Sequence, residues 1–366
     1  MNNKIISIHY LRGIAALLVV FFHFRFYLNN VYAQHDLGTL LFGGGAFGVD
    51  LFFMISGFII AMSTNKTNSP FIFVIRRFFR IYPAFILTFL IGAYFVYYNM
   101  PIDSIVRSMF FIHKDYSLES PSFGYNILGP AWTLTYEFYF YFTFVIAMSI
   151  SHSYRILISS ILITVPMLVI HLFFSGRIDI SGGGSPLIPD ETICYSLIRF
   201  LGSPIMLEFI IGMIAYEIFL RFPADKKHLT FPKVIFYISL GIFSFFYFQN
   251  NYYGFGLQGF GLWSVILMTG FLIHEKYSTT KVNKTLSFLG DISYSLYLTH
   301  YVIINALDLY KPLFWINSHG ISKFLLATTI CLLAAYLTFN FVERPFIRIG
   351  KSIEEKTKSM LTASDN

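Results

Sequence analysis

Two ionisable residues, Arg12 and His23, stand inside the first long apolar stretch of the sequence. Their separation is about three helical turns, so a helix would present both side chains on one face, about 16 Å apart along its axis. Ionisable groups within membrane helices are costly and often functional. Histidine serves as a base or a nucleophile near neutral pH, which makes His23 a catalytic candidate with the cation Arg12 on the same helix face. The alternatives are that Arg12 snorkels to the membrane interface and that His23 is a hydrogen-bonded packing residue.

A carboxylate in another apolar stretch matches the expected depth of His23. Glu137 would lie about 10 Å, and His23 about 8 Å, from the outer ends of their helices. A carboxylate bonded to the second ring nitrogen would fix the tautomer and support the imidazolium. We therefore predict a His23–Glu137 contact. Five further residues are candidates for a substrate pocket: Asp50, Ser56, Trp132, Tyr294 and His300. For Asp50 and His300, as for Glu137, the alternative is an isolated interhelical hydrogen bond.

Three arginines, Arg76, Arg77 and Arg80, end the segment that joins the second and third apolar stretches. Their spacing would crowd them at one end of a helix, with aromatic residues between and after them. Guanidinium groups bind phosphate through paired hydrogen bonds, so the cluster predicts a phosphate site. The alternative is a positively charged anchor for lipid headgroups.

The composition indicates that helices in a membrane carry these residues. Of 366 residues, 12% are charged, against about 25% in a soluble protein, and 56% are apolar. The mean hydropathy is +0.64. These values exclude a disordered chain, a disulfide-rich secreted domain and an ordinary cytosolic enzyme. The long apolar runs disfavour an outer-membrane barrel, and the net charge of +7 indicates loops facing anionic lipid rather than nucleic acid.

The fold class predicted is an all-α membrane protein, a polytopic bundle of about ten transmembrane helices. The first stretch lacks a cleavage site and is predicted to be a span rather than a signal peptide. Glu208 and Glu217 fall in the sixth span, with no role that the sequence defines. The ten predicted spans are 6–28, 46–63, 80–99, 130–150, 155–174, 194–220, 233–249, 255–273, 286–308 and 321–342.

Lys and Arg predict the orientation of these spans, because cytoplasmic loops hold most of them. Both termini are predicted to be cytoplasmic, and the loops at 29–45, 100–129, 175–193, 250–254 and 309–320 to face outward. Seven Lys and Arg residues are assigned to the outer side: Arg25, Arg107, Lys114, Arg177, Arg199, Lys311 and Lys323. Arg12 lies inside the first span, and all the others are assigned to the cytoplasmic side.

Six motifs in order resemble the acyltransferase 3 family of integral-membrane acyltransferases, and they cover nearly the whole chain. They are LRGIAA at 11–16, followed by His23, GVDLFFMISGF at 48–58, RRFFRIYP at 76–83, AWTLTYEFYFY at 131–141, LGDISYSLYLTH at 289–300 and FVERP at 341–345. The resemblance implies a ten-helix transmembrane domain over 1–348, followed by a polar cytoplasmic tail at 349–366. It implies no esterase-like domain after the bundle, which some family members carry.

The resemblance also implies roles for individual residues. His23 resembles the essential histidine of the family, and Arg12 resembles its arginine partner. Arg77 and Arg80 resemble the arginines that hold the phosphates of CoA, and Glu137 resembles the intramembrane acid.

The expected function is a membrane-bound O-acyltransferase in the bacterial cytoplasmic membrane. It would move an acyl group, acetyl by preference, from cytoplasmic acetyl-CoA to a hydroxyl of an exopolysaccharide, an O-antigen or a lipid-linked sugar. The lipid bilayer and the glycan are the expected partners, without metal or nucleic acid. Succinyl or longer groups, the acceptor sugar, the oligomeric state, and a base or acyl-carrier role for His23 stay open. The alternative is a transporter or flippase with a buried polar site, which would not need acetyl-CoA.

Overall fold

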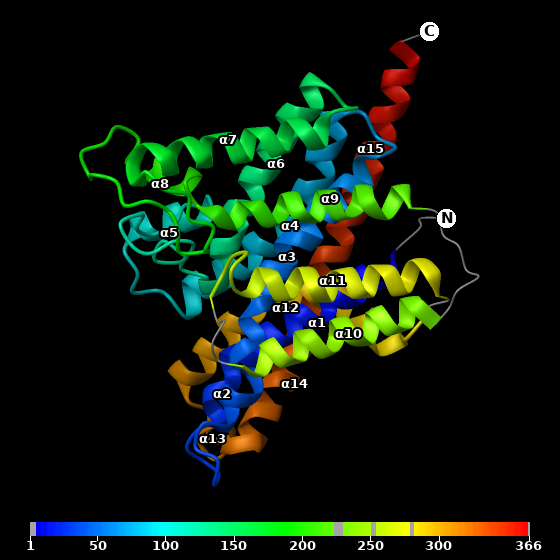
Figure 1. Cartoon of the computed structure of the whole chain (residues 1–366). Helices are drawn as coiled ribbons and strands as arrows, with labels where there is room; N and C mark the ends of the chain where they lie inside the picture. The colour runs from blue at the N-terminus through cyan, green and yellow to red at the C-terminus, as the bar shows by residue number, and fades with distance from the viewer. Residues whose placement is uncertain (1–4, 223–229, 250–253, 279–281, 365–366) are drawn as a thin grey trace.

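The computed structural model describes residues 5–222, 230–249, 254–278 and 282–364, and this part of the chain is almost entirely helical (Figure 1). The helices are α1 (Ile6–Phe24), α2 (Leu37–Phe42), α3 (Gly48–Thr64), α4 (Pro70–Phe95), α5 (Ile102–Met109), α6 (Trp132–Ile150), α7 (Arg155–Ser175), α8 (Tyr195–Leu201), α9 (Leu207–Arg221), α10 (Thr230–Phe248), α11 (Phe260–Tyr277), α12 (Lys284–Tyr310), α13 (Leu313–Ile316), α14 (Gly320–Thr338) and α15 (Arg344–Ser364).

The helices support a multi-pass membrane protein. Among the described residues, 7 helical segments are long and apolar enough to cross a membrane, or 8 when the bent pair α8 and α9 counts as one span. The two remaining predicted spans are occupied by α11 and α12, which are long enough but not apolar enough to be counted by composition. All ten predicted intervals therefore contain a helix, and composition alone supports seven or eight crossings.

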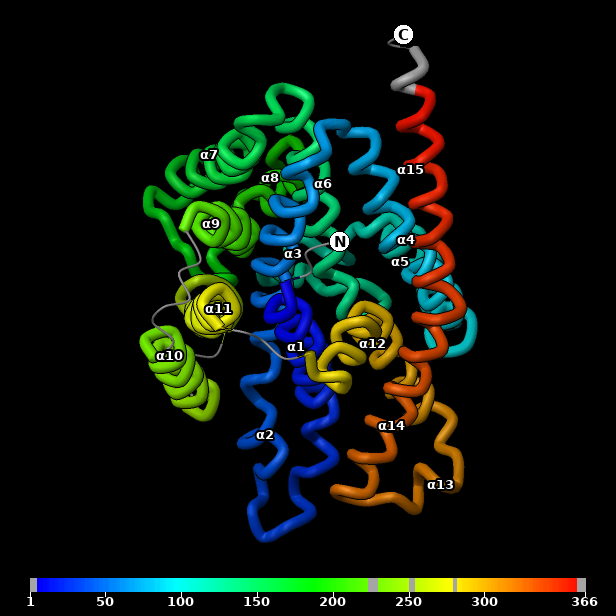
Figure 2. Tube along the Cα trace, turned by 90° about the vertical axis from the view of Figure 1, so that its right-hand side faces the viewer, coloured from blue at the N-terminus to red at the C-terminus, as the bar shows by residue number. Residues whose placement is uncertain are grey.

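The centre of the bundle is formed by α1 and α3, with α9, α11 and α12 packed around them (Figure 2). Small residues allow these close crossings. A β-carbon added at Gly13 of α1 would lie 2.6 Å from the backbone nitrogen of Gly290 in α12. At the crossing of α3 and α9, β-carbons on Gly57 and Gly212 would overlap backbone carbonyl oxygens of the opposite helix.

The prediction of where the third span begins is wrong. We expected a helix from residue 80, but α4 begins at Pro70, so Arg76, Arg77 and Arg80 lie within the helix and not at its end. The hydroxyl of Ser69 caps this start by accepting a hydrogen bond from the Ile72 amide at 3.4 Å. Proline at the first helical position also favours this helix start. An N–H at that position has no partner within a helix, so its absence in proline costs no hydrogen bond. The charged residues had concealed almost three additional helical turns, about 2.8 at 3.6 residues per turn.

The predicted sixth span is broken in two. The axes of α8 and α9 differ in direction by 45° across a short break. Pro204 opens the single 3-10 turn Pro204–Met206 that joins them, and a proline cannot donate the backbone hydrogen bond that would continue the preceding helix. The composition of this stretch is apolar on both sides, which explains why it was predicted as one helix.

The polar segment after Arg348 is helical as far as Ser364, which the composition had not indicated. A five-residue π-helical turn, Phe339–Glu343, joins α14 to α15. The two helices therefore continue one another, and α15 packs along α4 (Figure 2).

Part of the orientation prediction lies outside the described residues. The outward loop at 250–254 is described only at Gly254, and Lys4, Lys226, Lys227 and Lys281 are not described. The predicted cytoplasmic position of both termini stays a prediction.

The helix crossing at Gly57 predicts a contrast between two glycines. Gly57→Val should lower the yield of folded protein strongly, because the new side chain would overlap the Phe209 carbonyl group of α9. Gly241→Val is the matched control, since a β-carbon at Gly241 in α10 meets no atom within 4 Å. Size-exclusion profiles and thermal unfolding midpoints in detergent would measure both. Equal behaviour of the two variants would contradict the role assigned to this crossing.

Candidate active site

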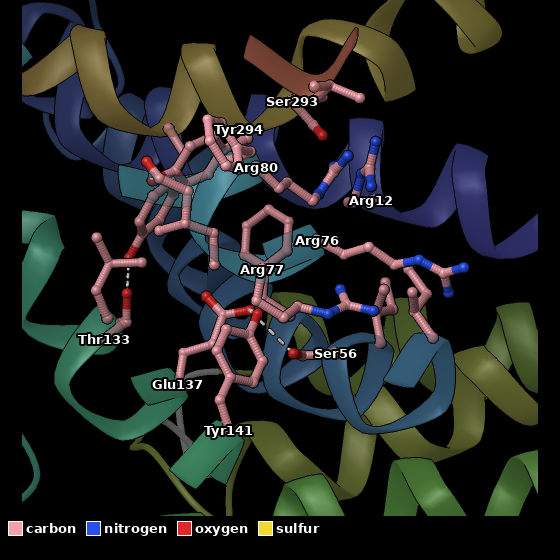
Figure 3. A pocket seen from close by; sticks show the side chains of 18 of the residues that line it. Arg12, Ser56, Arg76, Arg77, Arg80, Thr133, Glu137, Tyr141, Ser293 and Tyr294 are labelled. Atoms are coloured by element: carbon pink, nitrogen blue, oxygen red, sulfur yellow. Dashed lines mark hydrogen bonds between the residues drawn. The ribbon is translucent and has the colours of Figure 1, made fainter. Parts of the chain in front are cut away.

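A cavity of about 350 Å³ lies between helices α1, α3, α4, α6, α12 and α15 (Figure 3). Seven of the residues singled out from the sequence line it: Arg12, Ser56, Arg76, Arg77, Arg80, Glu137 and Tyr294. The helices that supply them are far apart in the sequence. The sequence analysis had placed Glu137 with His23 and the three α4 arginines at a separate helix end, so this grouping was not predicted, and the roles of these residues stay proposals.

The three arginines of α4 have different partners. Arg76 donates two hydrogen bonds to the Glu354 carboxylate, at 2.7 and 2.5 Å. Arg77 donates to the hydroxyl of Ser63 at 2.8 Å and lies over the rings of Phe73 and Tyr141. Arg80 lies within ion-pair distance of the Glu343 carboxylate, at 3.9 Å. Arg80 is thus only weakly paired, and Arg77 is held without any carboxylate partner within ion-pair distance in the described part of the chain.

Arg12 enters the same cavity from α1. Its guanidinium donates a hydrogen bond of 2.5 Å to the backbone carbonyl of Gly290 in α12. The Nε atoms of Arg12 and Arg77 are both buried, and neither has a hydrogen-bond partner among the described residues. The close approach of α1 and α12 at Gly13 and Gly290 brings the Arg12 guanidinium to this carbonyl. Both arginines keep donor capacity for an anionic ligand.

Glu137 lies on the side of the cavity formed by α6. Its Oε1 atom accepts hydrogen bonds from the hydroxyl of Ser56, at 3.0 Å, and from the hydroxyl of Tyr141 (Figure 3). Tyr141 follows Glu137 by one helical turn, which places both side chains on the same face. The sequence analysis missed Tyr141, although this spacing was a usable signal.

The predicted contact between His23 and Glu137 is not formed. The nearest rings to His23 from another helix are those of His300, with centroids 5.2 Å apart, and Tyr301, at 5.4 Å. No hydrogen bond or ion pair joins His23 to Glu137 in the described part of the chain. Depth along the bundle was the basis of the prediction, and depth does not fix the lateral position of a helix.

His23, His300 and Tyr301 form a second group that we call the imidazole cluster. The Nδ1 atom of His300 lies 3.1 Å from the carbonyl of Leu296, so this nitrogen carries the proton and donates it. The Nε2 atom of His300 is buried, with no hydrogen-bond partner in the described chain. The cluster thus presents an imidazole nitrogen with an unused lone pair.

Tyr297 connects the cavity with the imidazole cluster. Its side chain lines the cavity, while its ring centroid lies 6.0 Å from that of His300. The Tyr297 hydroxyl contacts the hydroxyl of Thr133 at 3.1 Å and the Pro130 carbonyl at 2.9 Å. The two polar regions are therefore adjacent parts of one candidate site.

Asp50, Trp132 and His300 do not line the cavity, contrary to the prediction of a shared pocket. Asp50 is fully buried, accepts a hydrogen bond of 2.7 Å from the Gly256 amide, and faces Glu208. Trp132 packs against aromatic rings, including Phe255 with centroids 5.4 Å apart. Asp50 and Trp132 therefore make packing contacts away from the cavity, whereas His300 belongs to the imidazole cluster beside it.

Positive charge exceeds negative charge along the cavity. The cationic lining residues are Arg12, Arg76, Arg77, Arg80 and Lys351, against the acidic residues Glu137 and Glu354. A site of this kind suits a ligand with several negative charges. Within the described residues, no group of three or more His, Cys, Asp or Glu side chains is arranged to hold a metal ion.

Comparison with known proteins assigns this chain to a family. Residues 5–340 match the model of an acyltransferase domain, that of the acyltransferase 3 family. The chain belongs to the acyltransferase 3 family. It is therefore a membrane acyltransferase, and the match favours an enzyme over the transporter or flippase considered from the sequence.

Individual relatives have low sequence identity to this chain, and two of them align with most of it. The chain is 28% identical over 331 residues to the exopolysaccharide production protein ExoZ of Rhizobium meliloti, covering 84% of this chain and 91% of that protein. It is 26% identical over 380 residues to a Staphylococcus aureus protein named, provisionally, as an O-acetyltransferase, and spans 57% of that relative's length. Acyltransferase MdmB of Streptomyces mycarofaciens is 30% identical over 139 residues, 35% of each chain. No solved structure matches the chain significantly.

The hydrogen bonds to Glu137 predict that Tyr141→Phe lowers acyl transfer. Removing a hydroxyl donor from a carboxylate should reduce the rate by roughly tenfold, because the loss of such a bond costs on the order of 1.5 kcal/mol. Tyr139→Phe on the same helix is the control, since the Tyr139 ring packs against Phe200 and its hydroxyl has no hydrogen bond in the described chain. A Tyr141→Phe enzyme with the full rate would contradict a function for this contact.

Proposed function

We propose that this protein is an O-acyltransferase that takes an acyl group, acetyl by preference, from acyl-CoA and transfers it to a hydroxyl of an envelope glycan. The observation that carries the proposal is the cationic cavity, whose arginines from α1 and α4 lie next to a region of hydroxyl groups and imidazoles. CoA carries several phosphates at one end and the reacting thioester at the other. The two parts of the site suit the two ends of such a donor.

The arginines would hold the phosphates of the donor. Arg77 and Arg80 lie on one face of α4 and lack tight carboxylate partners, so their N–H groups are available to phosphate oxygens. Arg12 adds a third cation from α1. The apolar walls formed by residues such as Phe52, Ile55 and Leu134 suit the pantetheine arm, which carries no charge.

The thioester would then lie near Thr133 and Tyr297, on the side of the cavity next to the imidazole cluster. His23 accepts the proton of the acceptor hydroxyl as its oxygen attacks the thioester carbonyl. The carbon–sulfur bond breaks, and the sulfur of CoA takes up a proton. In the other role open to histidine, His23 first carries the acyl group and then passes it to the hydroxyl.

A glycan acceptor is supported by the relative named for exopolysaccharide production, which aligns with 84% of this chain. The acetyl group is supported by the staphylococcal relatives named for O-acetyl transfer. The excess of Lys and Arg in one set of loops supports a bacterial cytoplasmic membrane location with both termini inside. In that orientation the glycan hydroxyl would reach the imidazole cluster from the outer half of the bundle.

The donor assignment predicts the effect of removing an arginine. Arg77→Ala and Arg80→Ala should each weaken CoA binding by roughly tenfold to a hundredfold, because a charge-assisted phosphate contact contributes about 1.5–3 kcal/mol. Titration of CoA onto the purified enzyme in nanodiscs would give the dissociation constants. Arg107→Ala in α5 is the control, since Arg107 is exposed and lies outside the cavity. Unchanged affinity in both cavity variants would return these arginines to the role of lipid anchors.

The chemical role of His23 predicts a complete loss of function in one variant. His23→Ala should abolish glycan acetylation at unchanged protein abundance and unchanged CoA affinity, because the imidazole cluster lies beyond the phosphate-binding region. His35→Ala is the control, with an exposed imidazole outside the site. NMR of acetyl groups on isolated envelope glycans would measure the outcome. Near-normal acetylation by the His23→Ala enzyme would refute the mechanism.

A further inference from the structure

The C-terminal helix α15 forms part of the cavity wall, although it begins after the last residue of the family match. Its four lining residues are Ile347, Gly350, Lys351 and Glu354. Their spacing corresponds to one stripe along a helix. The opposite face carries Ser352, Glu355 and Lys356, which are exposed. Glu354 of this stripe is therefore buried against the cavity, and Lys351 lies at its solvent-exposed edge.

Close packing holds α15 at this position. A β-carbon added at Gly350 would lie 2.8 Å from the β-carbon of Phe79 in α4, so only glycine permits the helices to approach this far. The π-helical turn before Arg344 makes α15 continuous with α14 and fixes its direction. Packing therefore fixes α15 as part of the cavity lining.

Glu354 is shared between two cations. Its carboxylate accepts both hydrogen bonds from Arg76, and its Oε1 atom also lies 2.6 Å from the Nζ atom of Lys358, one turn further along α15. A carboxylate that binds a guanidinium in this paired geometry occupies the same donors that a phosphate would use. Glu354 thus occupies the phosphate-binding donors of Arg76 when no ligand is bound.

Lys351 contributes a positive charge that the structure does not pair. No carboxylate of the described residues lies within ion-pair distance of its amine, in contrast with Lys358 of the same helix. Its side chain lines the cavity together with Arg76, Arg77 and Arg80. A lysine beside three arginines is suited to a ligand with several phosphates.

We infer that α15 belongs to the donor site: Lys351 binds a phosphate group of the donor, and Glu354 gives up Arg76 to another phosphate when the donor binds. This inference rests on the proposed function, since acyl-CoA is the donor assigned there. After the exchange, Glu354 keeps Lys358 as its partner, so no carboxylate is left unpaired. The two residues favour donors that carry several phosphates, because one phosphate can then occupy the donors of Arg76 while another pairs with Lys351.

The test is the dissociation constant of CoA for the full-length enzyme in nanodiscs. Lys351→Gln should weaken binding by roughly threefold to tenfold, a range that allows for the exposure of the lysine. Lys351→Arg, which keeps the charge, should restore most of the affinity. Glu354→Gln should tighten binding by roughly threefold to tenfold, because Arg76 is freed from a charged competitor and the cavity gains net positive charge.

Neighbouring residues of α15 supply the controls. Lys356→Gln and Glu355→Gln change the charge of the same helix by the same amount on its exposed face, and both should bind CoA as the unmodified enzyme does. Equal effects of Lys351→Gln and Lys356→Gln, or weaker binding by a Glu354→Gln enzyme with an unchanged unfolding midpoint, would overturn the inference. Failure of the unmodified enzyme to bind CoA would instead contradict the donor assignment of the proposed function.

Discussion

Positive charge inside an apolar helix bundle is the constraint on which the rest of this structure depends. Guanidinium groups lose most of their hydration there, and each must be compensated by hydrogen bonds or negative charge. The compensating group differs at each position. Arg12 donates to a backbone carbonyl, Arg77 contacts aromatic rings and a hydroxyl, and Arg76 pairs with a carboxylate. Compensation is incomplete, since two Nε atoms stay unpartnered in the described chain. A cavity with this balance is prepared for an anionic ligand more than for stability alone.

Helix packing and charge compensation are therefore one problem in this fold. The carbonyl that receives Arg12 belongs to Gly290, where an added β-carbon would lie 2.5 Å from the His9 carbonyl oxygen of α1. A larger residue at that crossing would separate the helices and take the carbonyl away from the guanidinium. In the same way, Gly350 sets the distance between α15 and α4, and with it the contact between Glu354 and Arg76. Small residues at helix crossings position the site as well as the bundle.

The sequence predicted most of the spans, since long apolar runs are a strong signal. It singled out seven residues of the cavity, Arg12 and Glu137 through their cost in a membrane and the α4 arginines through their spacing. It failed where local composition and structure diverge. Two adjacent arginines hid the start of α4, and a polar composition hid α15, yet Arg76, Arg77, Lys351 and Glu354 of these segments line the cavity. The His23–Glu137 pairing failed for another reason. Helical rise gives depth within the membrane, but which helices lie side by side depends on crossings such as Gly57 with Gly212, which no single-sequence period reveals.

The separation of Glu137 from His23 changes the division of labour that a histidine–carboxylate pair would imply. Glu137 shares the cavity with the arginines and is bonded to Ser56 and Tyr141, so its charge contributes to balancing the cations. The imidazoles lie past Tyr297, among aromatic rings. An imidazole accepts a proton only in its neutral form, and distance from the phosphate-binding charges lets the two regions act independently. A donor with phosphates at one end and a thioester at the other can occupy both regions at once. Its phosphates would lie among the arginines of the cavity and its thioester beside the imidazole cluster.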